Sequence, residues 1–225
     1  MKQKLGVITI GQSPRDDVVP EMKEFLGENV EIIQSGALDG LEREEIEEFK
    51  PEEGDYVLIS KLRDGSSVKF SEGHILPRLQ DCIDKLEDKG VDIILFICTE
   101  VFPDIFKSTV PVLYPQKIIH GVVPNLLDKG KLAIITPDKD QIKQSQEKWG
   151  EIVSNVEVVS ASPYTEVDEF PEAIDILRDS DASIVVMDCM GYTGKMKERV
   201  VKETDKMVVL SRTIVARILG EILNS

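Results

Sequence analysis

Two stretches of this chain decide its fold: residues 91–100, VDIILFICTE, and residues 183–192, SIVVMDCMGY. In each, an apolar run (91–97 or 183–188) leads directly to a cysteine, Cys98 or Cys189. Short continuous apolar runs are typical of strands buried on both faces in a parallel sheet. Ligands of open α/β sheets bind at the carboxyl ends of such strands. We therefore expect both thiols at a binding edge.

The starts of the two halves also resemble each other. Residues 4–9 (KLGVIT) and 131–136 (KLAIIT) match at most positions, and each precedes a polar loop and a helical pattern. The first half is longer because it contains two strand-like runs, 56–61 and 67–70, which flank Asp64-Gly65. An Asp-Gly pair between such runs is a strong hairpin signal. The pattern predicts a duplicated architecture with one cysteine in each copy.

The remaining periodicity alternates between strands and helices. Further strands are expected at 5–10, 30–33, 110–113, 132–136, 156–160 and 207–210. Helices are expected at 41–49, 73–89, 120–127, 138–153, 169–178, 194–202 and 212–223. A further helix is expected directly after residue 13, where Pro20 implies a kink or a later helix start. This alternation favours right-handed crossovers and mainly parallel sheets. We expect an α/β protein with two pseudo-symmetric lobes, 1–115 and 116–210, around a shared cleft. The terminal helix, 211–225, is expected to pack back on the first lobe.

Composition excludes several classes of function. The chain has 27 Lys and Arg against 42 Asp and Glu, a formal net charge of −15. Nucleic acid and anionic membranes repel such a surface, so neither is an expected partner. The sequence contains no apolar run of the roughly 20 residues that a membrane span needs and no signal-peptide cleavage site. The three cysteines form no CxxC pair, which favours reduced thiols in the cytoplasm.

The two cysteines suggest acid–base chemistry at a carbon atom. Removing the proton next to a carboxylate needs a base on one face, and returning a proton needs an acid on the other. A thiolate and a thiol can supply both without a cofactor. Candidate helices follow both cysteines, and a helix N-terminus lowers a thiol pKa below about 8.5. The alternative is that Cys98 and Cys189 are buried packing residues, as we expect of Cys82 on the helix at 73–89.

The loop after the first strand is a candidate anion site. It contains Gly11, Gln12, Ser13 and Arg15. Backbone N–H groups at a helix start bind anions, Ser13 can donate its hydroxyl, and Arg15 can hold a carboxylate through two hydrogen bonds. The structural alternative is that Ser13 caps a helix that begins at Pro14. The loop lacks both GxGxxG and GxxxxGK[ST], so no nucleotide is expected.

Further polar residues stand near these strand ends. Thr136 occupies the place in the second lobe that the loop occupies in the first, and Thr99, Gly191 and Tyr192 follow the cysteines. They are candidates to hold a substrate, although each is individually more typical of a structural role.

The acidic neighbours Glu100 and Asp188 would raise the pKa of an adjacent thiol unless a cation compensated them. The histidines, His74 and His120, are remote in sequence from the cysteines, so we expect no metal. GxSxG does not occur, which argues against a serine hydrolase of that type.

Several segments together resemble the AroM family. They are TIGQSPRDD (9–17), ICTE (97–100), VVMDCMGY (185–192) and VVLSRTIVARILGEIL (208–223). The resemblance covers essentially the whole chain. The family is similar in layout to the Asp/Glu/hydantoin racemase superfamily, whose two lobes enclose an active site with two cysteines and no pyridoxal phosphate or metal. The resemblance maps these cysteines onto Cys98 and Cys189 and the substrate-carboxylate loop onto residues 11–15.

Three positions depart from the racemase pattern. Thr99-Glu100 stands where racemases usually have Asn-Thr, Met190-Gly191 stands where glutamate racemases have Thr-His, and Gln12-Ser13 replaces Asp-Ser. These departures leave the substrate open and weaken the case for amino-acid racemisation in particular.

The leading hypothesis is a cofactor-independent racemase or isomerase of a small carboxylic acid, which the superfamily resemblance suggests is a homodimer. One alternative is a non-catalytic sensor of a small acid, motivated by Glu100 and Met190. Another is a lyase or decarboxylase, which would need only one of the two cysteines.

Overall fold

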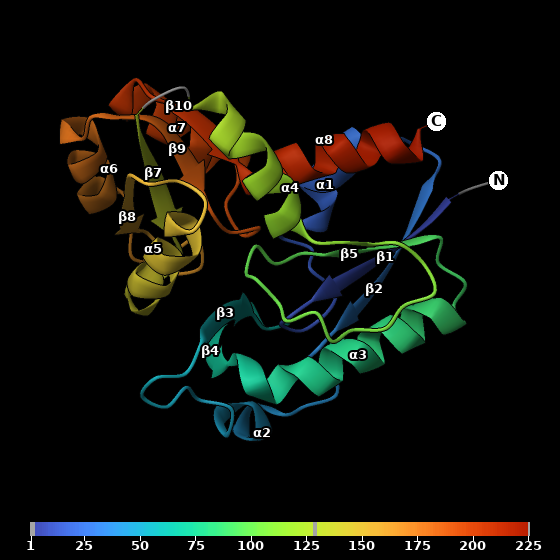
Figure 1. The fold of residues 1–225 in the computed structure, drawn as a ribbon. Coiled ribbons are helices and arrows are strands. Elements are labelled where there is room, and N and C mark those ends of the chain that lie inside the picture. Colours follow the sequence, from blue (N-terminus) through green and yellow to red (C-terminus); the bar gives the residue numbers. More distant parts are fainter. Residues whose placement is uncertain (1–2, 128–129, 225) are drawn as a thin grey trace. The chain divides into compact units, whose positions relative to one another are not determined.

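The computed structural model describes residues 3–127 and 130–224. The chain divides into two compact units: unit 1 is Met1–Pro115 with Arg217–Ser225, and unit 2 is Gln116–Ala216. Each unit contains a four-stranded parallel sheet with helices against it (Figure 1). Across the described residues, no helix has both the length and the apolar character needed to cross a membrane.

The sheet of unit 1 has the strand order β2–β1–β5–β6, and all its pairings are parallel. Its strands are β1 (Gln3–Thr9), β2 (Val30–Gly36), β5 (Ile93–Phe96) and β6 (Val112–Leu113). All four residues of β5 are buried, as are the last five of β1. Burial on both faces explains why these strands are continuous apolar runs and do not alternate with polar residues.

Helices and a hairpin surround this sheet. The helices are α1 (Val19–Leu26), α2 (Arg43–Glu47) and α3 (Glu72–Asp88). Strands β3 (Val57–Lys61) and β4 (Ser67–Ser71) form the expected antiparallel hairpin. Its turn contains Gly65 with φ of 90°, a conformation that favours glycine. Helix α3 runs along the sheet (Figure 1) and buries an apolar stripe that includes Cys82, as expected.

The sheet of unit 2 has the order β10–β9–β7–β8, again entirely parallel. Its strands are β7 (Lys131–Thr136), β8 (Val156–Ser160), β9 (Ala182–Met187) and β10 (Met207–Leu210). The helices of this part of the chain are α4 (Pro115–Val122), α5 (Ile142–Gly150), α6 (Phe170–Asp179) and α7 (Gly194–Thr204), and α8 (Ser211–Leu223) begins in unit 2. Short 3₁₀ helices lie at Val123–Leu126 and Lys139–Gln141.

The two sheets have the same topology. If only the strands of each four-stranded sheet are counted along the chain, the spatial order in both sheets is second, first, third, fourth. The third strand is β5 in unit 1 and β9 in unit 2, and each cysteine stands two residues after its end. The backbone pairing matches as well: Ile97 N donates to Ile8 O at 2.8 Å, and Asp188 N donates to Ile135 O at 2.9 Å. The expected duplicated α/β architecture is confirmed.

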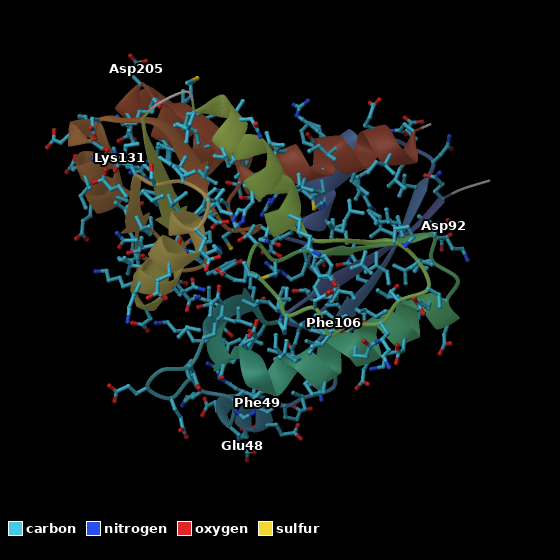
Figure 2. All side chains as sticks on the ribbon, viewed as in Figure 1. Glu48, Phe49, Asp92, Phe106, Lys131 and Asp205 are labelled. Atoms are coloured by element: carbon cyan, nitrogen blue, oxygen red, sulfur yellow. The ribbon has the colours of Figure 1, made fainter. Side chains whose placement is uncertain are left out.

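Polar contacts at the opposite strand ends are mostly exposed. Asp92, labelled in Figure 2, precedes β5 and accepts a 2.7 Å hydrogen bond from Lys4 N. Lys131, also labelled, starts β7 and contacts Asp181 at 2.5 Å and Glu157 at 3.7 Å. Exposed pairs of this kind contribute little to stability. The fold therefore depends on the buried apolar faces of the sheets.

For the first helix, the start expected at Pro14 is wrong, and the later start implied by Pro20 is confirmed. No helix begins at Pro14: α1 begins at Val19, with Pro20 in its first turn. The Ser13–Pro14 peptide bond is cis, the Ser13 hydroxyl donates to Asp39, and no helix starts after Ser13 for it to cap. Pro20 suits a first turn because its missing N–H would have no partner there.

Smaller shifts occur at other elements. The helix expected at 120–127 starts earlier, at Pro115, and passes into a 3₁₀ turn at Val123–Leu126, where Pro124 cannot continue the α-helical hydrogen bonds. Its expected end at Gly130 borders residues 128–129, which lie outside the described residues. The strand expected at 110–113 is limited to Val112–Leu113.

Helix α8 crosses the boundary between the units, because its residues up to Ala216 belong to unit 2 and those from Arg217 belong to unit 1. In unit 1, the Arg217 guanidinium lies 4.4 Å from the centre of the Phe25 ring. Gly220 lies so close to the carbonyl of Phe25 that a Cβ atom would collide with it. The contact between α8 and the end of α1 therefore requires glycine.

Gly220→Ala is expected to destabilise the protein, although alanine is the better helix former by about 1 kcal/mol. The collision with the Phe25 carbonyl outweighs that preference because backbone cannot move aside cheaply. The matched control is Gly121→Ala in α4, where a Cβ meets nothing within 4 Å and a small stabilisation is expected. Melting temperatures test both; a stabilised Gly220→Ala variant would contradict the packing argument.

Candidate functional site

Cys98 is followed by a segment without regular structure. Between Cys98 and the short strand β6, all residues are described and none is helical, so the expected helix behind this cysteine is absent. Aromatic contacts hold the segment: the Phe96 ring lies 5.5 Å from Phe102, 5.6 Å from Phe106 (labelled in Figure 2) and 5.0 Å from Tyr114. Cys98 therefore does not precede a helix N-terminus, which would favour its thiolate form. Its neighbours are side chains from other segments.

The surroundings of Cys98 are acidic. Cys98, Thr99 and Glu100 are all buried, with Cys98 8% exposed. The Tyr56 hydroxyl donates a 2.5 Å hydrogen bond to Glu100 Oε2. Burial, then the charge of Glu100 and its hydrogen bond, and then Cys98 raise the pKa of Tyr56 far above its usual range. The phenol thus stays protonated and donates to the Glu100 carboxylate.

A second carboxyl group lies close to Glu100. Burial, followed by the charge of Glu100, raises the pKa of Glu72. The Oε1 atom of Glu72 is buried and has no hydrogen-bond partner within the described part of the chain. Both effects favour the protonated form of Glu72.

Cys189 has a different set of neighbours. It is partly exposed, and its sulfur accepts a hydrogen bond from Gly191 N at 3.3 Å. The Tyr164 hydroxyl lies 3.4 Å from the same sulfur. Helix α7 begins five residues later, where the Thr193 side chain caps it by accepting from Met196 N at 3.3 Å.

Gly191 is required for the contact between Tyr164 and Cys189. A Cβ atom on residue 191 would collide with the hydroxyl end of Tyr164, whose ring carbon Cζ would lie only 2.5 Å away. The glycine thus leaves the space in which the tyrosine reaches the sulfur. Gly191 acts here through its small size and its N–H group.

Buried groups of unit 2 fix the loop after Cys189. The Arg212 side chain, 1% exposed, donates to the carbonyls of Met190 at 2.8 Å and Gly191 at 3.0 Å. Tyr192 is completely buried and donates to Ala161 O at 2.8 Å. Burial, then Cys189 and Tyr164, raise the Tyr192 pKa well above its usual value. Tyr192 therefore holds the loop in place with its proton retained.

Asp188, which precedes Cys189, belongs to a buried ion pair. Its Oδ2 atom accepts from Trp149 Nε1 at 2.7 Å and lies 2.9 Å from Lys148 Nζ, and the Lys148 and Asp188 side chains are only 4% and 3% exposed. The His120 ring contacts Trp149 edge-on, with centroids 4.5 Å apart. Burial lowers the pKa of His120, against the opposing effect of Asp188. The expected compensating cation beside Asp188 is thus Lys148.

The backbone N–H groups of residues 11–15 donate hydrogen bonds to other groups of the protein. Four N–H groups are engaged: Gly11 with Thr9 Oγ1 at 3.1 Å, Gln12 with Lys61 O at 3.3 Å, Ser13 with Asp39 Oδ1 at 2.8 Å and Arg15 with Gln34 Oε1 at 2.8 Å. Pro14 has no N–H. A ligand anion would have to displace one of these acceptors, and binding of a substrate by this loop stays a prediction.

The side chains of this loop are also engaged. The Ser13 hydroxyl donates to Asp39 Oδ2 at 2.6 Å, and the Gln12 amide donates to Leu41 O at 3.2 Å. Arg15, 3% exposed, holds the Asp17 carboxylate through two hydrogen bonds of 2.8 and 2.9 Å. Burial would raise the Asp17 pKa, but the hydrogen bonds and charge of Arg15 lower it overall. Arg15 thus binds a carboxylate through two hydrogen bonds, but that carboxylate belongs to Asp17 of the protein itself.

The structure brings the sequence-predicted residues together in two groups. Thr99 stands with Cys98, while Gly191 and Tyr192 stand with Cys189; Thr136 is buried at the end of β7. Sequence reasoning missed Tyr56 and Tyr164, which approach the cysteines from distant segments and carry no motif. Within the described ranges, no cluster of three or more His, Cys, Asp or Glu side chains is arranged to hold a metal ion.

Solved structures of known proteins share the fold of this chain. Three solved structures of similar fold are Picrophilus torridus aspartate racemase (12% identity, TM-score 0.60), the maleate isomerase Iso from Pseudomonas putida S16 (13%, 0.65) and an allantoin racemase from Klebsiella pneumoniae (10%, 0.61). Each comparison covers 99% of this chain and, respectively, 94%, 93% and 88% of the other. The chain therefore has a racemase-like α/β fold.

The family follows from the sequence itself. The model of the AroM protein family matches residues 5–223, nearly the whole chain. The chain belongs to the AroM family. No curated protein matched it by sequence.

Lys148→Met is expected to destabilise the protein by about 3–5 kcal/mol, because it leaves the buried Asp188 carboxylate without its cation. The matched control is Lys143→Met on the same helix, which removes an exposed pair with Glu147 at 3.9 Å and should change stability little. Chemical denaturation measures both changes. Equal effects of the two substitutions would show that the buried pair has no special role.

Stability is also expected to fall in mild acid because of His120. Its pKa in the folded protein lies below the reference value of 6.5, so below that pH the unfolded chain binds a proton that the folded protein does not. His120→Phe, which keeps a ring against Trp149, removes this proton uptake. Free energies of unfolding at about pH 7.5 and 5.5 should differ less for the variant than for the unmodified protein; an unchanged difference would exclude His120 as the cause.

Proposed function

We propose that this protein is a cofactor-independent racemase or isomerase of a small carboxylic acid, and that Cys98 and Cys189 are its acid and base. The observation that carries the proposal is their equivalent placement. Each cysteine stands two residues after the third strand of a parallel sheet, and the two sheets have the same strand order. The carboxyl ends of such strands are where α/β proteins bind ligands.

The proposed reaction requires both thiol groups at one carbon. One sulfur, as thiolate, removes the proton next to the carboxylate, and the electron pair left behind is delocalised into that carboxylate. The other sulfur, as thiol, returns a proton to the opposite face. The protein regenerates its starting charge when the two sulfurs exchange a proton with water or when the reaction runs backwards. Thr99 and the backbone N–H groups after each cysteine are candidates to hold the carboxylate.

The names of the similar structures suggest which substrates to try. They act on aspartate, maleate and allantoin, so substrates of this size, with a carboxylate or a related acidic carbon, come first. The departures at Glu100 and Met190 place an acidic and an apolar side chain beside the cysteines, which favours a substrate other than a simple amino acid.

A second candidate function is a non-catalytic sensor of a small acid. It is favoured by the loop of residues 11–15, whose hydrogen-bond donors are occupied by Asp39, Asp17 and other internal acceptors. A sensor would be stabilised by its ligand without turning it over. Substitution of either cysteine would then leave ligand-induced stabilisation intact.

Deuterium exchange tests the proposal most directly. D- and L-aspartate, maleate and allantoin are incubated with the protein in D₂O, and NMR follows the label at carbon. We expect exchange or isomerisation of at least one small acid, with Cys98→Ser and Cys189→Ser each lowering the rate by at least about 100-fold, the usual scale for loss of an acid–base group.

The matched control is Cys82→Ala, which removes the third cysteine from the core side of α3 and should leave the rate unchanged. Full activity of either serine variant on an identified substrate would exclude paired-cysteine chemistry. Loss of activity in only one of them would favour the single-cysteine lyase or decarboxylase. A rise in melting temperature without turnover would favour the sensor.

A further inference from the structure

We propose that unit 1 carries a further binding site, which takes a small amphipathic anion: a molecule with an apolar body and one carboxylate or similar acidic group. The site is a groove between helix α2 (Arg43–Glu47) and strand β4 (Ser67–Ser71), both labelled in Figure 1. Its lining shares no residue with the groups described around Cys98. The proposal is therefore independent of the cysteine chemistry and can be tested without it.

The groove has the size and the apolar lining of a small-molecule site. Its cavity volume is about 390 Å³, and such sites usually measure roughly 300–1,000 Å³. Its apolar lining includes Ile46 and Leu62, which are 1% and 8% exposed, and the partly buried Val68. All three side chains belong to the hydrophobic core of unit 1 or pack against it. An apolar group in the groove would therefore extend that core and remove more apolar surface from water.

Contacts between the two walls hold the groove in shape. At one end, Ser71 N of β4 donates a 2.8 Å hydrogen bond to the carbonyl of Phe49, which follows α2 and is labelled in Figure 2. At the other end, the Arg43 guanidinium donates to Ser66 Oγ at 3.4 Å and lies 3.6 Å from Asp64 Oδ2 in the hairpin turn. A groove that is shaped before its ligand arrives loses less conformational entropy on binding.

The charged lining of the groove is positive, although the whole chain has a formal net charge of −15. Among its described lining residues are three cations, Arg43 and Lys50 on the α2 side and Lys69 on β4, and one anion, Glu47. Glu47 lies 3.8 Å from Arg43 and 3.7 Å from Lys50, and all three of these side chains are more than half exposed. Exposed pairs of this kind contribute little to stability. A bound carboxylate can therefore contact the same cations at little cost to the fold.

A second cavity of unit 1 has a similar size but the opposite charge. It is lined by the end of α1 and the start of β2, and its volume is about 440 Å³. Its lining includes the apolar residues Leu26 and Ile32, together with Lys23, Glu24 and Glu28. Size and apolar character are thus common to both cavities, and charge distinguishes them. The groove between α2 and β4 is therefore the one that we expect to attract an anion.

The groove also continues toward the loop of residues 11–15. A neighbouring cavity of about 400 Å³ shares Arg43, Ile46 and Leu62 with it and is lined by Gln12 as well. An apolar body that extends past Ile46 would therefore approach this loop. The expected ligands thus include molecules longer than a single ring.

Titration of the ¹⁵N-labelled protein, followed by NMR, tests the site. The probes are 4-isopropylbenzoate, its uncharged analogue 4-isopropylbenzamide, and a short glutamate peptide that represents an acidic partner chain. We expect the benzoate to shift amide signals of residues 43–51 and 62–69 and to bind at least about threefold more tightly than the benzamide, the scale of one exposed charge pair. Equal or tighter binding of the benzamide would overturn the preference for an anion. Tighter binding of the peptide would replace the small molecule with an acidic chain, and no binding of either aromatic probe at millimolar concentration would overturn the site.

Variants of the lining test where the probe binds. Lys50→Gln and Lys69→Gln should each weaken benzoate binding at least about threefold and leave benzamide binding unchanged. Val68→Phe, which adds a ring to the apolar lining, should weaken binding of both probes. The matched control is Lys23→Gln, which removes a cation from the cavity beside α1 and should change neither. Benzoate binding that survives all three groove substitutions, or that falls as much in Lys23→Gln, would overturn the proposal.

Discussion

The pairing of the first and third strands in each sheet is the constraint on which the rest of the structure depends. β1 pairs with β5 and β7 with β9, all in parallel, so the carboxyl ends of each pair meet at one edge. Apolar packing on both faces of these strands fixes their register, because a shift by one residue would exchange the buried sets. The position of each cysteine in the chain trace follows from that register. Chemistry can therefore vary around the cysteines while the fold keeps them in place.

Polar groups at these strand ends are largely satisfied by the protein. Asp39 and Asp17 occupy the donors of the loop at residues 11–15, and Lys148 neutralises Asp188. Buried charges and donors without partners are costly, so a loop rich in donors tends to acquire internal acceptors. The same residues that look like a ligand site in sequence can thus serve to hold the loop.

Most of the fold could be predicted from the sequence because its strands and helices have strong, short-range patterns. The apolar runs before Cys98 and Cys189, the Asp64-Gly65 turn and the stripe along α3 each depend on neighbouring residues. The repeat of residues 4–9 and 131–136 correctly indicated two related sheets. Pro20 indicated the later start of α1, whereas the bond from the Ser13 side chain to Asp39, 26 positions away in the chain, has no local signal in the sequence. Tyr56 and Tyr164 could not be predicted as neighbours of the cysteines for the same reason: they approach from distant segments, and no local spacing records that approach.

Helix α8 has a consequence for how the protein is made. Unit 1 consists of the first part of the chain and of the residues after Ala216, which include Arg217 against Phe25 and Gly220 against the same residue's carbonyl. During synthesis on the ribosome, the strands of the first sheet are made first, but unit 1 lacks this last piece until the residues after Ala216 have been made. Unit 2, which is continuous in sequence, is therefore complete before unit 1 is. A stop codon or a cleavage shortly before Arg217 would therefore remove part of the first unit while sparing nearly all of the second.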